Sequence, residues 1–201
     1  MTPEKPSAPA RVLNINDDAA TRYFMGKILE QAGYSVLEAP DGTTGLALAR
    51  ERPDLIILDV RLPDISGLEV CRRLKADPLT MHIPVLQTSA MFVSSERKVE
   101  GLDSGADAYL AQPIDDIELL AIVRAMLRTR RAEEAERLAA LKWQRTFDAM
   151  GDGVMVLDAQ RHVINCNRAM AKLLNVGQEE ALGSSVDRLL GSRVSRELLQ
   201  A

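Results

Sequence analysis

The sequence predicts an α/β fold: a doubly wound sheet of five parallel strands, with helices on both faces. Three observations support this fold class. Five short apolar segments alternate with helical patterns between residues 11 and 128, and glycine or proline separates most of them. The third segment, residues 55–58, is an unbroken apolar run of the kind that is buried on both faces of a sheet. Alternation at this spacing is typical of βα units.

The composition is that of an ordinary soluble protein. The 201 residues are 46% hydrophobic and 27% charged, with a net charge of −4, so no general affinity for nucleic acid is expected. No apolar run approaches the roughly 20 residues of a membrane span. Cys71 and Cys166 lack metal-type spacing, and we expect both to be buried in a cytoplasmic, reducing setting. Residues 1–10, with three prolines, predict a disordered lead.

Capping and turn residues define the first two βα units. Asp17 or Asp18 can cap the first helix, because a carboxylate at that position accepts unpaired backbone N–H groups. This helix ends at Gly33, and the second helix ends before Pro53. The first helix carries apolar side chains at helical spacing: Tyr23, Phe24, Ile28 and Leu29. The expected strands are residues 11–16 and 34–39, and the expected helices are residues 19–33 and 43–52.

The remaining units repeat the pattern. Ser66 or Gly67 begins the third helix, and Asp77-Pro78 ends it. Its inward side chains are expected to be Leu68, Val70, Cys71 and Leu74. The strand at residues 83–88, the polar helix at 94–104, the short strand at 108–111 and a fifth helix from Asp115 complete the fold.

Polar groups follow four of the five strands at their carboxyl ends. They are Asp17 and Asp18, Asp59, Ser89 and Gln112. In open α/β sheets the carboxyl ends of the strands form the ligand-binding edge. Helix capping explains one such acid, but it does not explain four groups that converge from different strands. The pattern therefore predicts a functional site at this edge.

Over residues 11–128 the chain resembles the receiver domain of two-component signalling. The resemblance is carried by the acid cluster at residues 16–18, the segment LDVRLPDISGLE, the pair Ser89-Ala90, the segment GLDSGADAYL, and Gln112-Pro113, in this order. Each motif alone is weak, whereas the ordered combination is specific.

The resemblance implies a role for each of these residues. Asp59 would accept a phosphoryl group from the phosphohistidine of a histidine kinase or phosphotransfer protein. Magnesium would be bound by Asp17, Asp59 and the backbone carbonyl of Arg61. Ser89 would be the switch hydroxyl and Tyr109 the switch aromatic. These roles agree with general chemistry, because aspartate can attack phosphorus and magnesium prefers oxygen ligands.

Two residues depart from the receiver pattern. Asn16 stands where the family has its first acid, so metal affinity should fall, with Asp18 and the oxygen of Asn16 as candidate additional ligands. Gln112 replaces a lysine, and a neutral hydrogen bond is worth about 0.5–1.5 kcal/mol against about 1.5–3 for a charged one. We therefore expect weakened switching. The alternative is a phosphorylation-independent receiver that acts as an interaction or dimerisation module.

Residues 115–150 are expected to form a single long helix. Its apolar face near the receiver is predicted at Ile117, Leu120, Val123 and Leu127. Further on, Leu127, Leu138 and Leu141 fit a heptad, which favours a homodimer through this helix. The alternative is an extended helix that only links two domains.

From about Trp143 the chain resembles the opening of a PAS sensor domain. Strands are expected at residues 153–157 and 162–165, and Asn167 should cap a helix at residues 168–174. The later strands of that family do not follow before Ala201, so we expect a piece of a longer protein or a domain completed by another segment. The expected organisation is a lead at 1–10, a receiver at 11–128, a helical linker at 129–142 and a partial PAS-like domain at 143–201.

The order of these parts resembles the front of a hybrid sensor histidine kinase. No phosphoacceptor histidine motif or ATP-binding glycine box is present, so the chain itself is not expected to be an enzyme. A haloacid-type phosphatase is disfavoured because Arg61 stands where that class requires a second acid. A DNA-binding regulator is disfavoured because no helix-turn-helix pattern follows the receiver.

Overall fold

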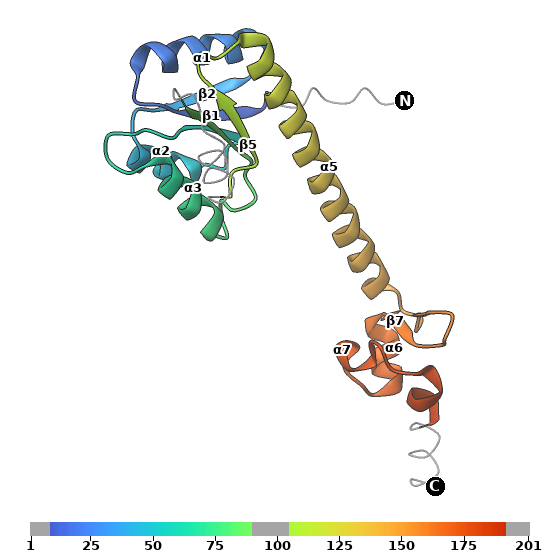
Figure 1. Ribbon diagram of the computed structural model, residues 1–201. Coiled ribbons are helices and arrows are strands. Elements are labelled where there is room, and N and C mark those ends of the chain that lie inside the picture. The colour runs from blue at the N-terminus through green and yellow to red at the C-terminus, as the bar shows by residue number, and fades with distance from the viewer. Residues whose placement is uncertain (1–8, 90–104, 192–201) are drawn as a thin grey trace, which may run out of the picture. The chain divides into compact units, whose positions relative to one another are not determined.

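Five parallel strands form one sheet in the order β2-β1-β3-β4-β5, which confirms the predicted doubly wound fold (Figure 1). The computed structural model describes residues 9–89 and 105–191; residues 1–8 of the lead expected at 1–10, Ala90 and the expected helix at 94–104 lie outside these ranges. Ala10, the last residue of that expected lead, is buried in the core instead. The strands are β1 (Arg11–Ile15), β2 (Ser35–Ala39), β3 (Leu55–Asp59), β4 (Val85–Ser89) and β5 (Ala108–Ala111). The helices of this part are α1 (Ala19–Gln31), α2 (Gly42–Ala49), α3 (Gly67–Ala76) and the start of α5 (Asp116–Ala149).

Each face of the sheet has its own core. Alternate residues of the central strands pack with α2 and α3 on one face, where Ile15 and Leu58 lie. The other face holds Ile57 with side chains of α1 and α5. Every residue of β3 is buried, as its unbroken apolar run predicted.

Helix caps occur where the sequence placed them. The Asp18 carboxylate caps α1 by accepting from the N–H of Thr21 at 2.7 Å, and Ser66 caps α3. After α1, Gly33 has a φ of 89°, a left-handed conformation that favours glycine. Sequence reasoning left the choice between Asp17 and Asp18 open, and the structure assigns the cap to Asp18.

Two predicted helix faces are partly wrong. Tyr23 and Phe24 are 63% and 53% exposed, and Met25, Gly26 and Leu29 are the buried residues of α1. In α5 the predicted Ile117 is 75% exposed, whereas Leu119 is fully buried. Residues two apart on a helix point about 200° apart, so Tyr23 and Ile117 face nearly away from the sides on which Met25 and Leu119 are buried.

An arginine attaches α5 to the beginning of β3. The guanidinium of Arg130 donates to the backbone carbonyl of Pro53 at 2.8 Å and also to that of Asp54. The contact lies at the opposite end of β3 from Asp59. It fixes the point at which α5 leaves the core of the five-stranded domain.

The chain divides into two compact units between residues 132 and 133. All side chains from Arg131 to Trp143 are exposed along α5. In the second unit, β6 (Met155–Leu157) pairs antiparallel with β7 (Val163–Cys166), followed by α6 (Arg168–Leu174) and α7 (Gln178–Ala181). Asn167 caps α6, as predicted. Among the described residues, no helix is both long and apolar enough to cross a membrane.

The carboxylate of Asp148 joins the end of α5 to the rest of the second unit. It accepts hydrogen bonds from the side chains of Gln144 and Gln178 and from the backbone N–H of Arg168. These hydrogen bonds lower the pKa of Asp148 below its ordinary value, with the bond from Gln178 contributing most. The two cysteines, Cys71 and Cys166, are buried as expected.

Candidate functional site at the carboxyl edge of the sheet

Asp59 is the last residue of β3 and is only 7% exposed. Two backbone hydrogen bonds fix the loop after it. The N–H of Val60 donates to the carbonyl of Thr88 at 3.0 Å, and the N–H of Gly67 donates to the carbonyl of Val60 at 2.9 Å. A Cβ on residue 67 would press against the carbonyl oxygen of Asp59 and lie 2.8 Å from the Cα of Val60. Glycine is therefore required where α3 begins, and its close approach fixes the backbone of Asp59.

The environment of Asp59 opposes ionisation. Burial, with a smaller contribution from the negative charge of Asp17, raises the pKa of Asp59 to about 6, although the backbone N–H groups of Val60 and Arg61 act in the other direction. One carboxylate oxygen, Oδ1, is buried and has no hydrogen-bond partner within the described part of the chain. A buried acceptor near a second carboxylate is unfavourable without a partner, and a bound cation or a hydrogen-bond donor would stabilise it.

The other predicted groups lie on the neighbouring strands. Ser89 ends β4 and is 7% exposed, and Tyr109 is half-buried in β5. The backbone N–H of Gln112 donates to the carbonyl of Ser89 at 2.8 Å, and the peptide bond between Gln112 and Pro113 is cis. These contacts bring residues 89 and 112 to the same edge of the sheet.

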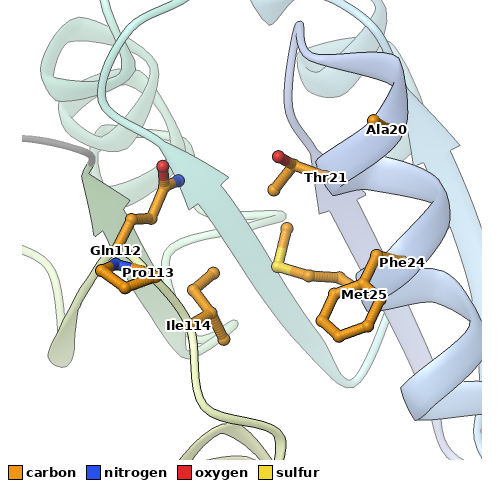
Figure 2. A pocket seen from close by; sticks show the side chains of 7 residues that line it. All are labelled: Ala20, Thr21, Phe24, Met25, Gln112, Pro113 and Ile114. Atoms are coloured by element: carbon orange, nitrogen blue, oxygen red, sulfur yellow. The ribbon is translucent and has the colours of Figure 1, made fainter.

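The side chain of Gln112 lines a pocket against α1, drawn in Figure 2. The pocket has a volume of about 600 Å³. The residues around it are Ala20, Thr21, Phe24, Met25, Gln112, Pro113 and Ile114. The exposed ring of Phe24, one of the apolar side chains that the sequence shows at helical spacing, thus forms part of a surface pocket next to the site.

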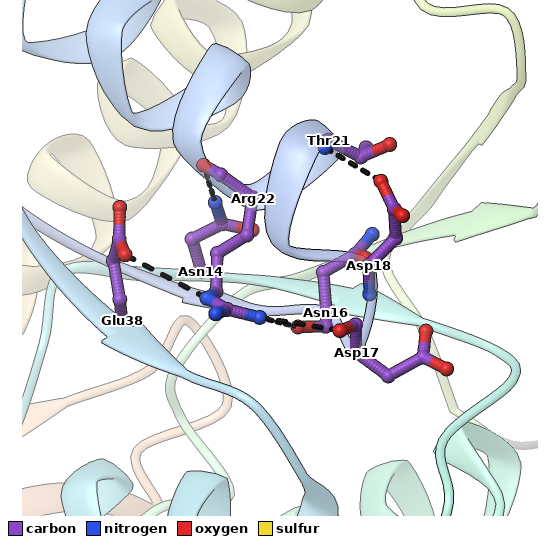
Figure 3. A network of polar contacts seen from close by, with 7 residues as sticks. All are labelled: Asn14, Asn16, Asp17, Asp18, Thr21, Arg22 and Glu38. Carbon is purple, nitrogen blue, oxygen red and sulfur yellow. Dashed lines mark hydrogen bonds and ion pairs between the residues drawn. The ribbon is translucent and has the colours of Figure 1, made fainter.

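Arg22 braces the loop that carries the acids (Figure 3). Its guanidinium donates to the backbone carbonyl of Asn16 at 2.6 Å and to that of Asp17 at 3.4 Å, and it lies 3.6 Å from the Glu38 carboxylate. Its own carbonyl accepts from the amide of Asn14. Sequence reasoning missed Arg22. A signal was available, because a cation near the N-terminus of a helix is unfavourable unless acceptors lie close to it.

Within the acid cluster the three side chains differ in their surroundings. Asn16 is 1% exposed, and its Oδ1 accepts from the N–H of Asp18 at 2.9 Å. Asp17 is exposed and adds its charge to the environment of Asp59. Asp18 uses an oxygen as the cap of α1, and the hydrogen bond from Thr21 lowers its pKa. Neither Asn16 nor Asp18 thus offers its full ligand capacity to a metal.

The donors at this edge fit a magnesium ion. Within residues 9–89 and 105–191, no three His, Cys, Asp or Glu side chains come together as a metal cluster. Magnesium is usually held by one or two carboxylates, with water and phosphate completing its shell. Asp17 and Asp59 are carboxylates of this kind, and the unpartnered oxygen of Asp59 is an acceptor that such an ion would satisfy.

Two further polar residues were missed. Thr88 pairs with Asp59 in the β3–β4 register, and its buried hydroxyl has no partner among the residues that the structure describes. Asp64 accepts from the N–H groups of Gly42 and Thr43 and from the Thr43 hydroxyl, which joins the loop after β3 to the start of α2. The sequence offers no signal for Thr88, whose position reads as an ordinary strand residue.

Two family models match this chain, one over each of its two parts. Residues 12–124 match the response regulator receiver domain, and residues 141–201 match the PAS fold. The chain is 49% identical over 119 residues to the DNA-binding dual master transcriptional regulator RpaA of Synechocystis, covering 59% of this chain and 49% of that protein. It is 37% identical over 159 residues to the response regulator PleD of Caulobacter vibrioides, covering 74% of this chain and 35% of that protein. The chain thus spans about half the length of these relatives, or less.

Solved receiver domains show the same fold. The signal receiver domain of a histidine kinase from Syntrophus aciditrophicus is 30% identical, with a TM-score of 0.56, and covers 60% of this chain and 91% of that one. The receiver domain of a sensor histidine kinase from Pseudomonas aeruginosa, with a magnesium ion in its active site cleft, is 26% identical, with a TM-score of 0.56, and covers 60% of this chain and 98% of that one. The chain therefore belongs to the response regulator receiver family over residues 12–124, and a PAS fold follows at residues 141–201.

Proposed function

We propose that this receiver accepts a phosphoryl group on Asp59 from a phosphohistidine, in a magnesium-dependent step of a phosphorelay. The observation that carries the proposal is the buried, partly unpaired carboxylate of Asp59 beside the charge of Asp17. A structural acid at a strand end needs no such surroundings. The histidine kinase or phosphotransfer protein that supplies the phosphohistidine is the implied partner.

In the transfer, an oxygen of Asp59 attacks phosphorus and forms the new P–O bond. The P–N bond of the phosphohistidine breaks, and its electron pair stays on the imidazole nitrogen. Asp17, Asp59 and the Arg61 carbonyl would hold magnesium, which neutralises charge on the phosphoryl oxygens when bound. Burial of Asp59 keeps water from the nucleophile, and the close contact of Gly67 holds its backbone in place. Ser89 and Tyr109 are proposed as the switch pair.

Two substitutions weaken the coupling between phosphorylation and conformational change. Gln112 cannot pair with the phosphoryl group as a cation, and its side chain lines the pocket against α1. Asn16 contributes no negative charge to metal binding. The same two residues favour the second candidate function, a receiver that works without phosphorylation as an interaction module.

Acetyl phosphate with magnesium separates the two functions. We expect the wild type to gain an acid-labile phosphate, detected by intact-mass spectrometry, and Asp59→Asn to gain none. Circular dichroism controls for folding of the variant. If folded wild type, shown to bind magnesium, takes up no phosphate, the phosphorylation-independent function holds instead. Gln112→Lys should enlarge the NMR shift changes that phosphorylation causes.

The signal is proposed to leave through α5. The proposed boundaries are a receiver at 11–128, a linker at 129–142 and a PAS-like region from 143, in the order found at the front of hybrid sensor kinases. The exposed Leu138 and Leu141 support a homodimer through α5. Light scattering of the full chain tests it: a dimer that Leu138→Glu dissociates supports the interface, and a wild-type monomer refutes it.

A further inference from the structure

The side chain of Asn16 is held in one orientation. Its Oδ1 accepts from the backbone N–H of Asp18 at 2.9 Å, and only the oxygen of the amide can accept a hydrogen bond. The Arg22 guanidinium fixes the backbone on which this side chain stands, through its bond to the Asn16 carbonyl (Figure 3). The NH₂ group of Asn16 must therefore point away from the N–H of Asp18.

That NH₂ group is buried and lacks a partner. Nδ2 of Asn16 makes no hydrogen bond to any residue in the described part of the chain. Burying an amide donor without a partner is unfavourable, so such groups are rare and indicate a missing ligand or water. The neighbouring Asn14, equally buried, has its own NH₂ group satisfied by the carbonyl of Arg22.

Asn16 and Asp59 each directly follow one of two paired residues at the carboxyl edge of the sheet. Ile15 pairs with Leu58 in the β1–β3 register, and both pack into the core on the α2 and α3 side. Asp59, the next residue of β3, therefore turns to the opposite face, and Asn16 directly follows Ile15 at the end of β1. Asp59 offers a buried acceptor, Oδ1, without a partner among the described residues, and Asn16 offers a buried donor in the same condition.

We propose that the Nδ2 group of Asn16 donates a hydrogen bond to a phosphoryl oxygen on Asp59. The donor thus replaces, without a charge, part of the contact that a lysine at position 112 would supply. Because its oxygen is committed to Asp18 and its other end is a donor, Asn16 is a phosphoryl-binding residue and not a metal ligand. This inference rests on the proposed phosphorylation of Asp59.

Two titrations of the full chain separate these roles: magnesium alone, and then beryllofluoride, a phosphoryl mimic, at saturating magnesium. Asn16→Asp keeps the acceptor for Asp18 and removes the donor, and Asn16→Ala removes both. We expect magnesium affinity within about twofold of wild type for the alanine variant and higher for the aspartate variant, which gains a carboxylate. Beryllofluoride affinity should fall about tenfold or more in both, as for loss of a hydrogen bond to a charged group.

The Asn16 side-chain amide gives a direct readout in the wild type. Its NMR signal, assigned by its absence in Asn16→Asp, should shift when beryllofluoride binds and shift little with magnesium alone. Equal beryllofluoride affinities in the three proteins, or a parallel loss of magnesium and beryllofluoride affinity in Asn16→Ala, overturn the inference but leave the proposed function standing. A wild type that binds magnesium but no beryllofluoride overturns both.

Discussion

Asp59→Asn should stabilise the metal-free receiver, and the gain should depend on pH. Raising the pKa of Asp59 from its ordinary 3.8 to about 6 makes ionisation about 3 kcal/mol less favourable in the fold than in the unfolded chain, at ~1.36 kcal/mol per pH unit. Solvent at the open edge reduces the realised value to about 1–3 kcal/mol. Asparagine has nearly the same shape and carries no charge, so it removes this opposition.

The sign follows from where each state holds the proton. As pH rises above 3.8, the unfolded chain loses its Asp59 proton, whereas the folded chain keeps it until about 6, so the wild type loses stability across this window and no further above it. The variant should thus exceed the wild type by about 1–3 kcal/mol at about pH 8 and by little at about pH 4. The low pKa of Asp64, caused chiefly by its bond from the Thr43 hydroxyl, is common to both proteins and cancels.

Calorimetry of the receiver transition in a chelating buffer measures the difference. Magnesium should then raise the melting temperature of the wild type and leave Asp59→Asn nearly unchanged, because a ligand stabilises only the state that binds it. A stability difference that is the same at both pH values refutes the assigned environment of Asp59. So does an equal magnesium response in the two proteins.

Three further substitutions test other contacts by thermal or urea unfolding. Gly67→Ala should destabilise the receiver by about 1–3 kcal/mol, because its Cβ overlaps the backbone of Asp59; unchanged stability would contradict that packing. Arg130→Gln should lower receiver stability by about 1.5–3 kcal/mol through its lost charged hydrogen bonds, with the exposed Arg131→Gln as a neutral control. Asp148→Asn should weaken the second unit at neutral pH but not at acid pH, since the stability from its lowered pKa is lost as pH falls through that pKa; equal loss at all pH values argues against the carboxylate.

The strands and the site-bearing edge were readable from the sequence because their signals are local. An unbroken apolar run that ends in Asp59 identifies β3, and Asn167, a favourable N-cap residue, indicates the start of α6. The helix faces were less secure. Phe24 and Ile117 are apolar residues just outside the buried ridges of α1 and α5, and sequence spacing alone does not fix which ridge meets the sheet.

The chemistry within the site was only partly predictable. Residue type identified Asn16 as a departure, but the direction of its amide depends on the backbone N–H of Asp18, a three-dimensional contact. The contact of Arg22 with the Asn16 carbonyl is close in sequence but depends on how α1 packs against the loop before it, and the unpartnered hydroxyl of Thr88 lies on a strand whose partner, Asp59, is distant in sequence. Such features follow from packing, which a linear pattern does not encode.

The strand β3, five residues long, ends at the buried carboxylate of Asp59 and begins directly after the backbone carbonyls that accept from Arg130. The two ends of β3 are positioned by the same backbone hydrogen bonds, which pair β3 with β1 and β4. A slip of one residue in this strand would turn Asp59 to the opposite face and shift the anchorage of α5 in the same event. The position of the Asp59 carboxylate and the attachment point of α5 therefore depend on one and the same strand register.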